Sequence, residues 1–326
     1  MASPLFSVSG MRIAIRRDEV ERVVVDGVDL VVDAGETLAL IGESASGKSL
    51  IALGALDLLS PGARVVAGAT RFEGATLQDL PDDDWRRLVG MGIGVLFQDA
   101  IGAWDPLDLM GLQSGEVLDA HTELTQEEIQ GRVLEALGEV GLSKKRHFLA
   151  FSHEVSRGQA QRMMLAAALL AAPRLLIADE PLSGLDVTVA RAVLDLIDDL
   201  RSKRGMGMLL VTHDLAMVAA IADRVAVVYS GMIVEESTAG AMYRRPRHPY
   251  TAGLLGSIPG LVGGRLRPIP GEAPDIFEVV VGCPFAPRCE YAVDRCRGER
   301  PALRPLDDAL VACHRAEELT LRGVMA

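Results

Sequence analysis

The sequence predicts an α/β fold with a mostly parallel sheet, and three short apolar runs lead to that prediction. Residues 37–41 (TLALI), 175–178 (LLIA) and 208–212 (MLLVT) are continuous apolar segments with the length of a buried strand. Stretches with helical spacing separate them. Strands that alternate with helices are typical of a parallel sheet, because parallel neighbours need a long crossover connection.

The first apolar run opens a glycine-rich segment. Residues 23–32 alternate and run apolar, as a strand pair would, and Ala34-Gly35 then supplies a turn. Residues 37–41 lead into a glycine-rich loop at residues 42–49, and residues 52–59 (ALGALDLL) are typical of a helix. A strand, a glycine-rich loop and a helix in this order begin a parallel α/β unit.

The middle of the chain, roughly residues 99–168, is predicted to be a helical subdomain inserted into this frame. Proline and acidic residues at positions 80–84 favour a helix start just before it. Residues 122–140 and 159–171 then have helical spacing.

The second half continues the alternation of helices and strands and then changes in residue composition. Residues 186–201 carry an apolar helical face, and residues 225–235 indicate a hairpin turned at Ser230-Gly231. Beyond this hairpin proline becomes frequent, periodicity weakens and all four cysteines appear. The sequence therefore predicts a first domain over residues 1–237 and a small, cysteine-containing C-terminal domain over residues 238–326.

Length and composition exclude several classes of protein. At roughly 150 residues per domain, 326 residues suffice for about two domains. The hydrophobic (49%) and charged (24%) contents are ordinary for a globular chain, which excludes disordered and collagen-like classes. A net charge of −12 argues against nucleic acid as a partner, because sequence-independent binding needs a cationic surface.

No segment reads as a membrane span or a signal peptide. The longest candidate, residues 163–178, is broken at Pro173-Arg174, whereas a span needs about 20 apolar residues. Residues 1–17 lack a basic region followed by an apolar one. We therefore expect a cytosolic protein that reaches a membrane only through a partner.

The glycine-rich loop fits the pattern G-x-x-x-x-G-K-[ST] at every position. Its residues are Gly42, Glu43, Ser44, Ala45, Ser46, Gly47, Lys48 and Ser49. Such a loop between a strand and a helix cradles nucleotide phosphates with backbone N–H groups. Lys48 is then predicted to reach the β- and γ-phosphates, and the Ser49 hydroxyl to ligate Mg²⁺.

Two acidic residues end the second apolar run. Asp179 and Glu180 directly follow residues 175–178. Beside a phosphate-binding loop, Asp179 is predicted to hold the Mg²⁺ shell, as the Walker-B acid does in P-loop NTPases. Glu180 is predicted to polarise the attacking water. The two motifs together predict a P-loop NTPase.

Four further motifs resemble those of the ATP-binding cassette (ABC) ATPases. Residues 155–159 (VSRGQ) resemble the LSGGQ signature, and residues 183–186 (SGLD) resemble the D-loop of that family. Gln98 in LFQD and His213 in VTHD resemble its Q-loop glutamine and switch histidine. Because the motifs occur in family order along essentially the whole chain, the sequence is similar to an ABC-type P-loop NTPase.

The resemblance implies a mechanism that uses two chains. Two cassettes dimerise head to tail, and each ATP is held by the phosphate loop of one and the signature of the other. The signature contacts made in trans are then Ser156, Gly158 and Gln159. In cis, the implied residues are Lys48, Glu180 as general base, His213 at the transition state, and Ser49, Gln98 and Asp179 around Mg²⁺. Catalysis of this kind is mainly positioning and charge stabilisation.

The sequence departs from the family pattern at two places. Val155 and Arg157 replace the leucine and the first glycine of the signature. A cation at a helix N-terminus opposes the helix dipole by about 0.3–1 kcal/mol, although it can also pair with phosphate. We hypothesise a heterodimer with a second ATPase subunit and one stronger site. Residues 11–25 contain no aromatic side chain to stack on adenine, so that contact stays unassigned.

C-terminal motifs narrow the resemblance to oligopeptide/dipeptide importer ATPases. Residues 247–255 (RHPYTAGLL) and 269–274 (IPGEAP) resemble two blocks of that group. Residues 97–100 (FQDA) and 105–107 (DPL) match the FQDP and NPL parts of its FQDPxxxLNPL pattern with two changes. The resemblance implies an ATPase that energises peptide uptake from the cytoplasmic face of the membrane. Its implied partners are two transmembrane permease subunits and an extracytoplasmic substrate-binding protein.

Four cysteines form the last candidate site: Cys283, Cys289, Cys296 and Cys313. Their spacing does not meet the common zinc pattern C-x₂₋₄-C, and a disulfide framework is disfavoured in the cytosol. Four thiolates are the usual ligands of an iron–sulfur cluster, and the resemblance implies a 4Fe-4S centre in some relatives. Zinc and unmetallated structural thiols remain alternatives.

Three other functions compete with peptide import. A nickel or metallophore importer ATPase shares the HPYT block. A soluble ABC ATPase that acts on DNA or ribosomes usually has two cassettes or a long coiled-coil insertion, and this sequence has neither. Against a catalytically weak regulatory cassette stand the intact Lys48, Glu180 and His213.

Overall fold

The computed structural model describes residues 3–17, 20–258, 268–275, 277–278 and 280–324. These residues group into two compact units. The first unit contains residues 32–35 and 72–210 with the residues before Ser7. The second unit contains residues 7–31, 36–71 and those from Val211 onward.

The strands of the first unit are the buried apolar runs. β6 (Ile93–Leu96), β7 (Leu175–Asp179) and β8 (Gly207–Val211) lie in the order β8-β7-β6. β6 and β7 are parallel, with Leu96 opposite Ala178. Every residue of β7 and β8 is buried. This confirms the parallel pairing that the apolar runs predict, because strands covered on both faces need no polar alternation.

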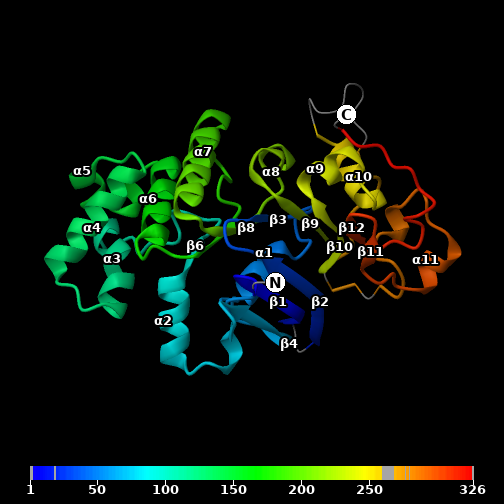
Figure 1. Cartoon of the computed structure of the whole chain (residues 1–326), viewed down its shortest axis with the longest axis horizontal. Coiled ribbons are helices and arrows are strands. Elements are labelled where there is room, and N and C mark those ends of the chain that lie inside the picture. Colours follow the sequence, from blue (N-terminus) through cyan, green and yellow to red (C-terminus); the bar gives the residue numbers. More distant parts are fainter. Residues whose placement is uncertain (1–2, 18–19, 259–267, 276, 279, 325–326) are drawn as a thin grey trace. The chain divides into compact units, whose positions relative to one another are not determined.

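Helices make up most of the first unit (Figure 1). They are α2 (Asp82–Gly92), α3 (Met110–His121), α4 (Gln126–Glu139), α5 (Lys144–Phe148), α6 (Arg157–Leu169) and α7 (Val187–Arg204), with 3₁₀ turns at Leu77–Asp79 and Ser152–Glu154 and the short strand β5 (Ala75–Thr76) beside them in the chain. α3 packs on α4, and α4 packs on α5 and α6. The expected helical character of residues 99–168 is confirmed. Thr125 and Glu128 begin α4 with a reciprocal capping box.

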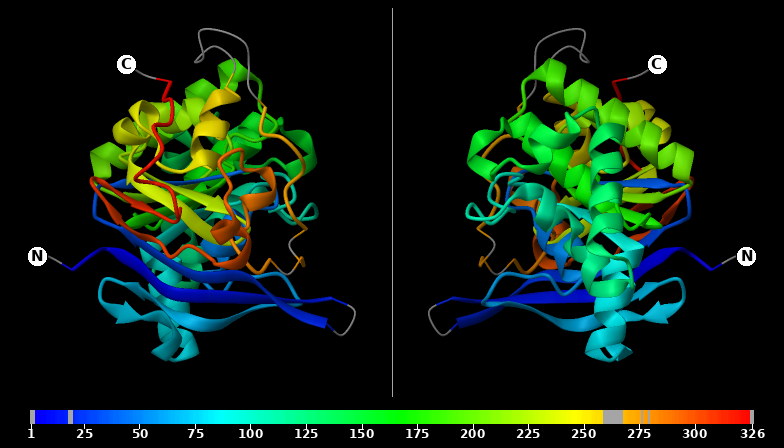
Figure 2. Two further views of the ribbon diagram at one scale, coloured as in Figure 1. Left: turned by 90° about the vertical axis from the view of Figure 1, so that its right-hand side faces the viewer. Right: turned by 90° about the vertical axis from the view of Figure 1, so that its left-hand side faces the viewer.

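A sheet of long strands opens the second unit. β1 (Phe6–Arg17), β2 (Val20–Val32) and β4 (Ala63–Phe72) lie side by side in the order β2-β1-β4 (Figure 2). The expectation of a strand pair within residues 23–32 is wrong, because these residues belong to one strand whose partner is β1. β1 mixes polar and small residues with its buried ones, and so lacks the continuous apolar run of the central strands.

A second set of strands carries the glycine-rich loop. β3 (Thr37–Ile41) pairs in parallel with β9 (Arg224–Tyr229), which forms a hairpin with β10 (Met232–Thr238). Both turn residues, Ser230 and Gly231, have positive φ, as a tight hairpin requires, which confirms the predicted turn. β12 (Ala309–Val311) and β11 (Arg304–Leu306) add antiparallel strands beyond β10.

Short helices complete the second unit. They are α1 (Lys48–Gly54), α8 (Leu215–Ile221), α9 (Ala239–Arg244), α10 (Pro249–Gly256) and α11 (Asp294–Gly298), with a 3₁₀ turn at Ala286–Arg288. The expected helix at residues 52–59 is misplaced: α1 begins at Lys48, directly from the loop, and ends at Gly54. Within the described part of the chain, no helix is long and apolar enough to span a bilayer.

Candidate functional site

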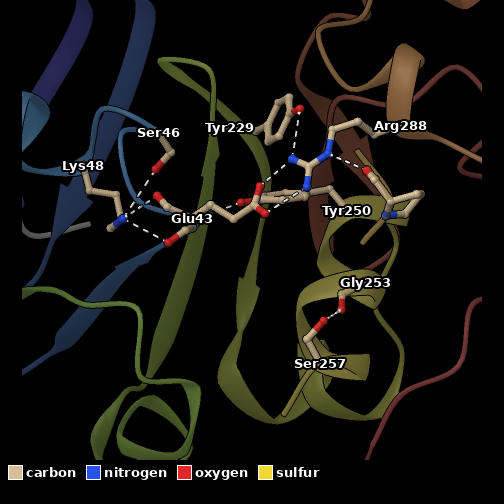
Figure 3. A network of polar contacts seen from close by, with 10 residues as sticks. Glu43, Ser46, Lys48, Tyr229, Tyr250, Gly253, Ser257 and Arg288 are labelled. Carbon is tan, nitrogen blue, oxygen red and sulfur yellow. Dashed lines mark hydrogen bonds and ion pairs between the residues drawn. The ribbon is translucent and has the colours of Figure 1, made fainter. Parts of the chain in front are cut away.

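The loop between β3 and α1 closes around its own lysine. Lys48 Nζ donates to the carbonyl oxygens of Gly42 and Glu43, both at 2.9 Å, and lies 3.5 Å from Ser46 Oγ (Figure 3). The Lys48 residue is only 6% exposed. The loop itself thus supplies two carbonyl oxygens and a hydroxyl around this ammonium group. The loop therefore has the chemistry expected of a phosphate cradle.

Close backbone approach explains the glycines of this loop. Gly42 has a φ of 155°, and a Cβ there would lie 2.3 Å from the carbonyl oxygen of Val228 on β9. Gly47 has a φ of 103°, and its Cβ would lie 3.3 Å from Cα of Gly231. The Gly231 N–H donates to the carbonyl of Ser46 at 2.8 Å. The β9–β10 turn thus packs directly against the loop, and side chains at Gly42 or Gly47 would separate them.

Glu43 has partners that sequence reasoning missed. Its N–H donates to the hydroxyl of Tyr250 at 2.8 Å, and its carboxylate receives two hydrogen bonds from Arg288. Tyr250 belongs to the HPYT block and Arg288 to the segment between the first two cysteines. The sequence motifs mark these places, but nothing in the sequence pattern indicates that they contact the loop.

The two acidic residues stand at the end of β7 in the first unit. Asp179 is the last strand residue and is 4% exposed. Glu180 follows with a φ of 48°, a conformation that non-glycine residues rarely adopt. Its carbonyl accepts the N–H of Ser183 at 3.0 Å, which turns the chain sharply after the strand. Backbone strain of this kind is typical of functional sites, which supports the predicted importance of Glu180.

The signature segment begins α6, also in the first unit. Ser156 caps the helix by accepting the N–H of Gln159, whose side chain in turn accepts the N–H of Ser156. A Cβ on Gly158 would lie 2.9 Å from Cγ1 of Val189, so α7 packs too closely for a side chain there. Arg157 is exposed at the first helical position, where no such approach demands a glycine.

Arg157 contacts the D-loop of its own chain. A Cβ on Gly184 would lie 2.6 Å from Nη1 of Arg157, and Gly184 has a φ of 73°. The guanidinium therefore lies directly against this glycine. The structure thus places the signature segment beside the segment that resembles the D-loop.

Gln98 and His213 are exposed residues that each lie two positions beyond the end of a strand. Gln98 lies two residues beyond the end of β6, beside the strand that ends in Asp179. His213 lies between β8 and α8, where Asp214 caps the helix. The first unit thus brings Gln98, Asp179 and the signature segment into one sheet-and-helix body, and the second unit holds the phosphate loop and His213. That these residues form one ATP site remains a prediction.

The four cysteines line one pocket in the second unit. The pocket has a volume of about 20 Å³ and is also lined by His248, Phe285 and His314. Burial raises the pKa of Cys283 and of Cys289, each to about 11, so these thiols are neutral near pH 7. Among the described residues, no group of three or more His, Cys, Asp or Glu side chains is arranged to hold a metal ion. The sulfur donors match a cluster in kind, but the positions of the residues are not those of a ligand shell.

Comparison with solved structures defines the class of protein. A dimeric post-hydrolysis state of the ATP-binding cassette MJ0796 bound to ADP and Pi aligns with a TM-score of 0.64 at 24% identity, over 72% of this chain and 98% of that one. A second dimeric MJ0796 structure, described as a bacterial ABC transporter cassette, gives 0.64 at 25% identity, over 72% of this chain and 98% of that one. The fold and the phosphate loop define an ATP-binding cassette of the P-loop NTPase class.

Comparison with characterised families goes further. A family model described as ABC transporter matches residues 25–183, and one described as the oligopeptide/dipeptide transporter C-terminal region matches residues 234–296. The putative peptide import ATP-binding protein BOV_A0348 of Brucella ovis is 40% identical, over 94% of this chain and 95% of its own length. The chain belongs to the family of oligopeptide/dipeptide ABC transporter ATP-binding proteins.

Two other relatives carry transport names. The oligopeptide transport ATP-binding protein OppD of Mycobacterium tuberculosis is 40% identical over 98% of this chain but only 53% of its own length. The chain therefore spans about half the length of this mycobacterial relative. The dipeptide transport ATP-binding protein DppD of Haemophilus influenzae is 39% identical, over 89% of each chain.

Proposed function

We propose that this chain is the ATP-hydrolysing subunit of an ABC importer for dipeptides or oligopeptides. The observation that carries the proposal is the phosphate loop closed around Lys48, in the same compact unit as the peptide-transporter C-terminal region. The transport names of the relatives support the substrate class. Selection of the peptide is assigned to the partners.

The chemistry follows from the residues at the loop and the strand ends. Lys48 gives up its carbonyl partners to bind the β- and γ-phosphates, and the glycine-rich backbone donates N–H groups to them. Ser49, Gln98 and Asp179 would hold Mg²⁺, which would supply positive charge to offset that of the phosphates. Glu180 accepts a proton from the attacking water and His213 stabilises the transition state. This division of roles rests on the family resemblance and on the position of each residue after a strand.

A second cassette completes each ATP site in this proposal. Ser156, Gly158 and Gln159 contact the γ-phosphate held by the partner, from the exposed start of α6. Arg157 weakens that contact, so the working dimer is a heterodimer in which this chain's own loop faces an intact signature. Two transmembrane permease subunits and an extracytoplasmic substrate-binding protein complete the importer, and the chain binds the permeases at the cytoplasmic face.

We infer a further cofactor for the cysteine pocket. Four thiols from residues 283–313 line one pocket, which supports a 4Fe-4S cluster as its occupant. The residues must close in to become ligands, and a cluster would then fix a loop-rich segment. Iron and sulfide analysis of anaerobically purified protein tests this. Iron and sulfide at about four atoms each per chain are expected, whereas zinc alone or metal-free thiols contradict the cluster.

The catalytic proposal is tested with Glu180→Gln in the reconstituted importer. ATP turnover and peptide uptake should both fall by roughly 100-fold or more, because a general base contributes that much. Glu135→Gln, which changes an exposed acid on α4, is the matched control and should behave as wild type. Unchanged uptake in Glu180→Gln would remove Glu180 from this role. Co-purification of a second cassette and two permeases tests the assembly, and a homodimer with full turnover contradicts the heterodimer.

A further inference from the structure

We propose that Arg288 is a positioning residue for the phosphate loop, acting through Glu43. The proposal rests on the proposed ATP-binding function and adds a residue outside the motifs that define that function. Glu43 and Arg288 are 245 positions apart in the sequence, yet they lie in the same compact unit. Arg288 sits in the 3₁₀ turn just before the second cysteine.

The contact between the two side chains is bidentate. Arg288 Nη1 lies 2.6 Å from Glu43 Oε2, and Nη2 lies 2.9 Å from Oε1 (Figure 3). Arg288 Nε donates to the carbonyl of Pro270 at 2.9 Å. The Arg288 side chain is 5% exposed and that of Glu43 is 31% exposed. A guanidinium held on three sides is fixed in its plane, so it fixes the carboxylate that it binds.

The backbone of Glu43 is held by a second residue of the C-terminal region. Its N–H donates to the Tyr250 hydroxyl at 2.8 Å, and Tyr250 is fully buried. The ring of Tyr229 packs edge-on against Tyr250 with centroids 4.6 Å apart, and its hydroxyl lies 3.4 Å from Arg288. Tyr250 therefore holds the main chain of Glu43, while Arg288 holds its side chain.

Glu43 links these contacts to Lys48 of the phosphate loop. The carbonyl of Glu43 accepts a hydrogen bond from Lys48 Nζ at 2.9 Å, while its N–H and carboxylate point to Tyr250 and Arg288. The orientation of Glu43 thus decides where one of the acceptors of Lys48 stands. Freeing Glu43 would let the loop adopt shapes that do not fit a triphosphate.

Charge gives Arg288 a second effect on the same loop. Glu43 places a carboxylate on the segment that is proposed to hold a polyphosphate, and like charges within a Debye length of about 8 Å repel. Arg288 neutralises that carboxylate at hydrogen-bond distance. Without Arg288, the unpaired acid would oppose the nucleotide. The substitution Glu43→Gln should then relieve the part of the defect that comes from charge.

A set of full-length variants tests the proposal by the affinity for a fluorescent ATP analogue, with the melting temperature measured in parallel. Arg288→Met should raise Kd about tenfold or more, and Arg288→Lys, which keeps the charge but not the fork, should be intermediate. Glu43→Gln/Arg288→Met removes the charge conflict but leaves residue 43 without its hold by Arg288, so its Kd should lie between those of Arg288→Met and wild type. In the assembled importer, Arg288→Met should raise KM for ATP and leave kcat within about twofold.

Arg247→Met is the matched control. Arg247 is also a buried arginine of this unit, at 8% exposure of its side chain, and pairs with Asp307 rather than with the loop. Arg247→Met should lower the melting temperature without changing Kd. A wild-type Kd for Arg288→Met overturns the positioning role, and so does a double variant with a wild-type Kd, because charge alone would then account for the loss. A wild-type chain that binds no nucleotide overturns the proposed function and this role with it.

Discussion

The buried carboxylate of Glu235 on β10 accepts the backbone N–H of His248 at 2.8 Å. His248 in turn accepts the N–H of Tyr250 at its Nδ1 atom, at 3.0 Å, and so caps α10. Burial lowers the pKa of His248 to about 3, so the ring is neutral at pH 7 and free to accept. The HPYT block therefore starts the helix that presents Tyr250 to Glu43 of the phosphate loop.

The cap at His248 is expected to contribute measurably to stability. His248→Ala removes the acceptor and a fully buried ring, and should lower the free energy of unfolding by about 1–3 kcal/mol. His248→Asn keeps a side-chain acceptor and should recover about 1 kcal/mol of that loss. Urea denaturation measures both. Equal destabilisation by Ala and Asn would contradict the capping role.

The Tyr250 hydroxyl is expected to act on nucleotide affinity. Tyr250→Phe leaves the N–H of Glu43 without its acceptor, which should cost about 1–3 kcal/mol of stability and raise Kd for ATP several-fold. Tyr243→Phe is the control, because the Tyr243 hydroxyl is also buried but bonds to the carbonyl of Leu215. It should lower stability with no change in Kd. An unchanged Kd in Tyr250→Phe would argue against a role of the Tyr250 hydroxyl in positioning the phosphate loop.

Local patterns predicted the strands and the turn around the loop well. The five buried residues of β3 and the positive-φ turn at Ser230-Gly231 have clear local causes, namely continuous burial and glycine-permitted geometry. The start of α1 at Lys48 was missed because polar loop residues there continue directly into the helix. β1 was missed because its outward positions interrupt the apolar run.

Long-range partners could not be predicted from the sequence. The pairing of Glu43 with Arg288 joins residues far apart in the chain, and neither residue type implies the other. The sequence also does not show why an arginine is accommodated at position 157 while position 158 is a glycine. The packing of α7 against Gly158 distinguishes the two positions. Motif spacing thus located the candidate site, while its supporting contacts came from tertiary structure.

Close packing at Gly158 gives a test of the helix contact beneath the signature. Gly158→Ala pushes a methyl group against Val189 and should destabilise the chain by about 1–3 kcal/mol. Adding Val189→Ala should restore part of that loss, because the shortened side chain makes room. Chemical denaturation of the single and double variants measures the coupling. Strictly additive losses would show that α7 does not limit this position.

The exposed Arg157 is expected to hinder the site that it completes in the partner chain. Arg157→Gly removes the cation at the start of α6 and its contact with Gly184, while the capping box of Ser156 and Gln159 stays intact. In the assembled heterodimer, ATP turnover should rise by up to about twofold, because at most one further site becomes active. Arg157→Lys, which keeps the charge, should stay at the wild-type rate. A fall in turnover for Arg157→Gly would show instead that the guanidinium assists the phosphate, as a cation placed beside a polyphosphate can.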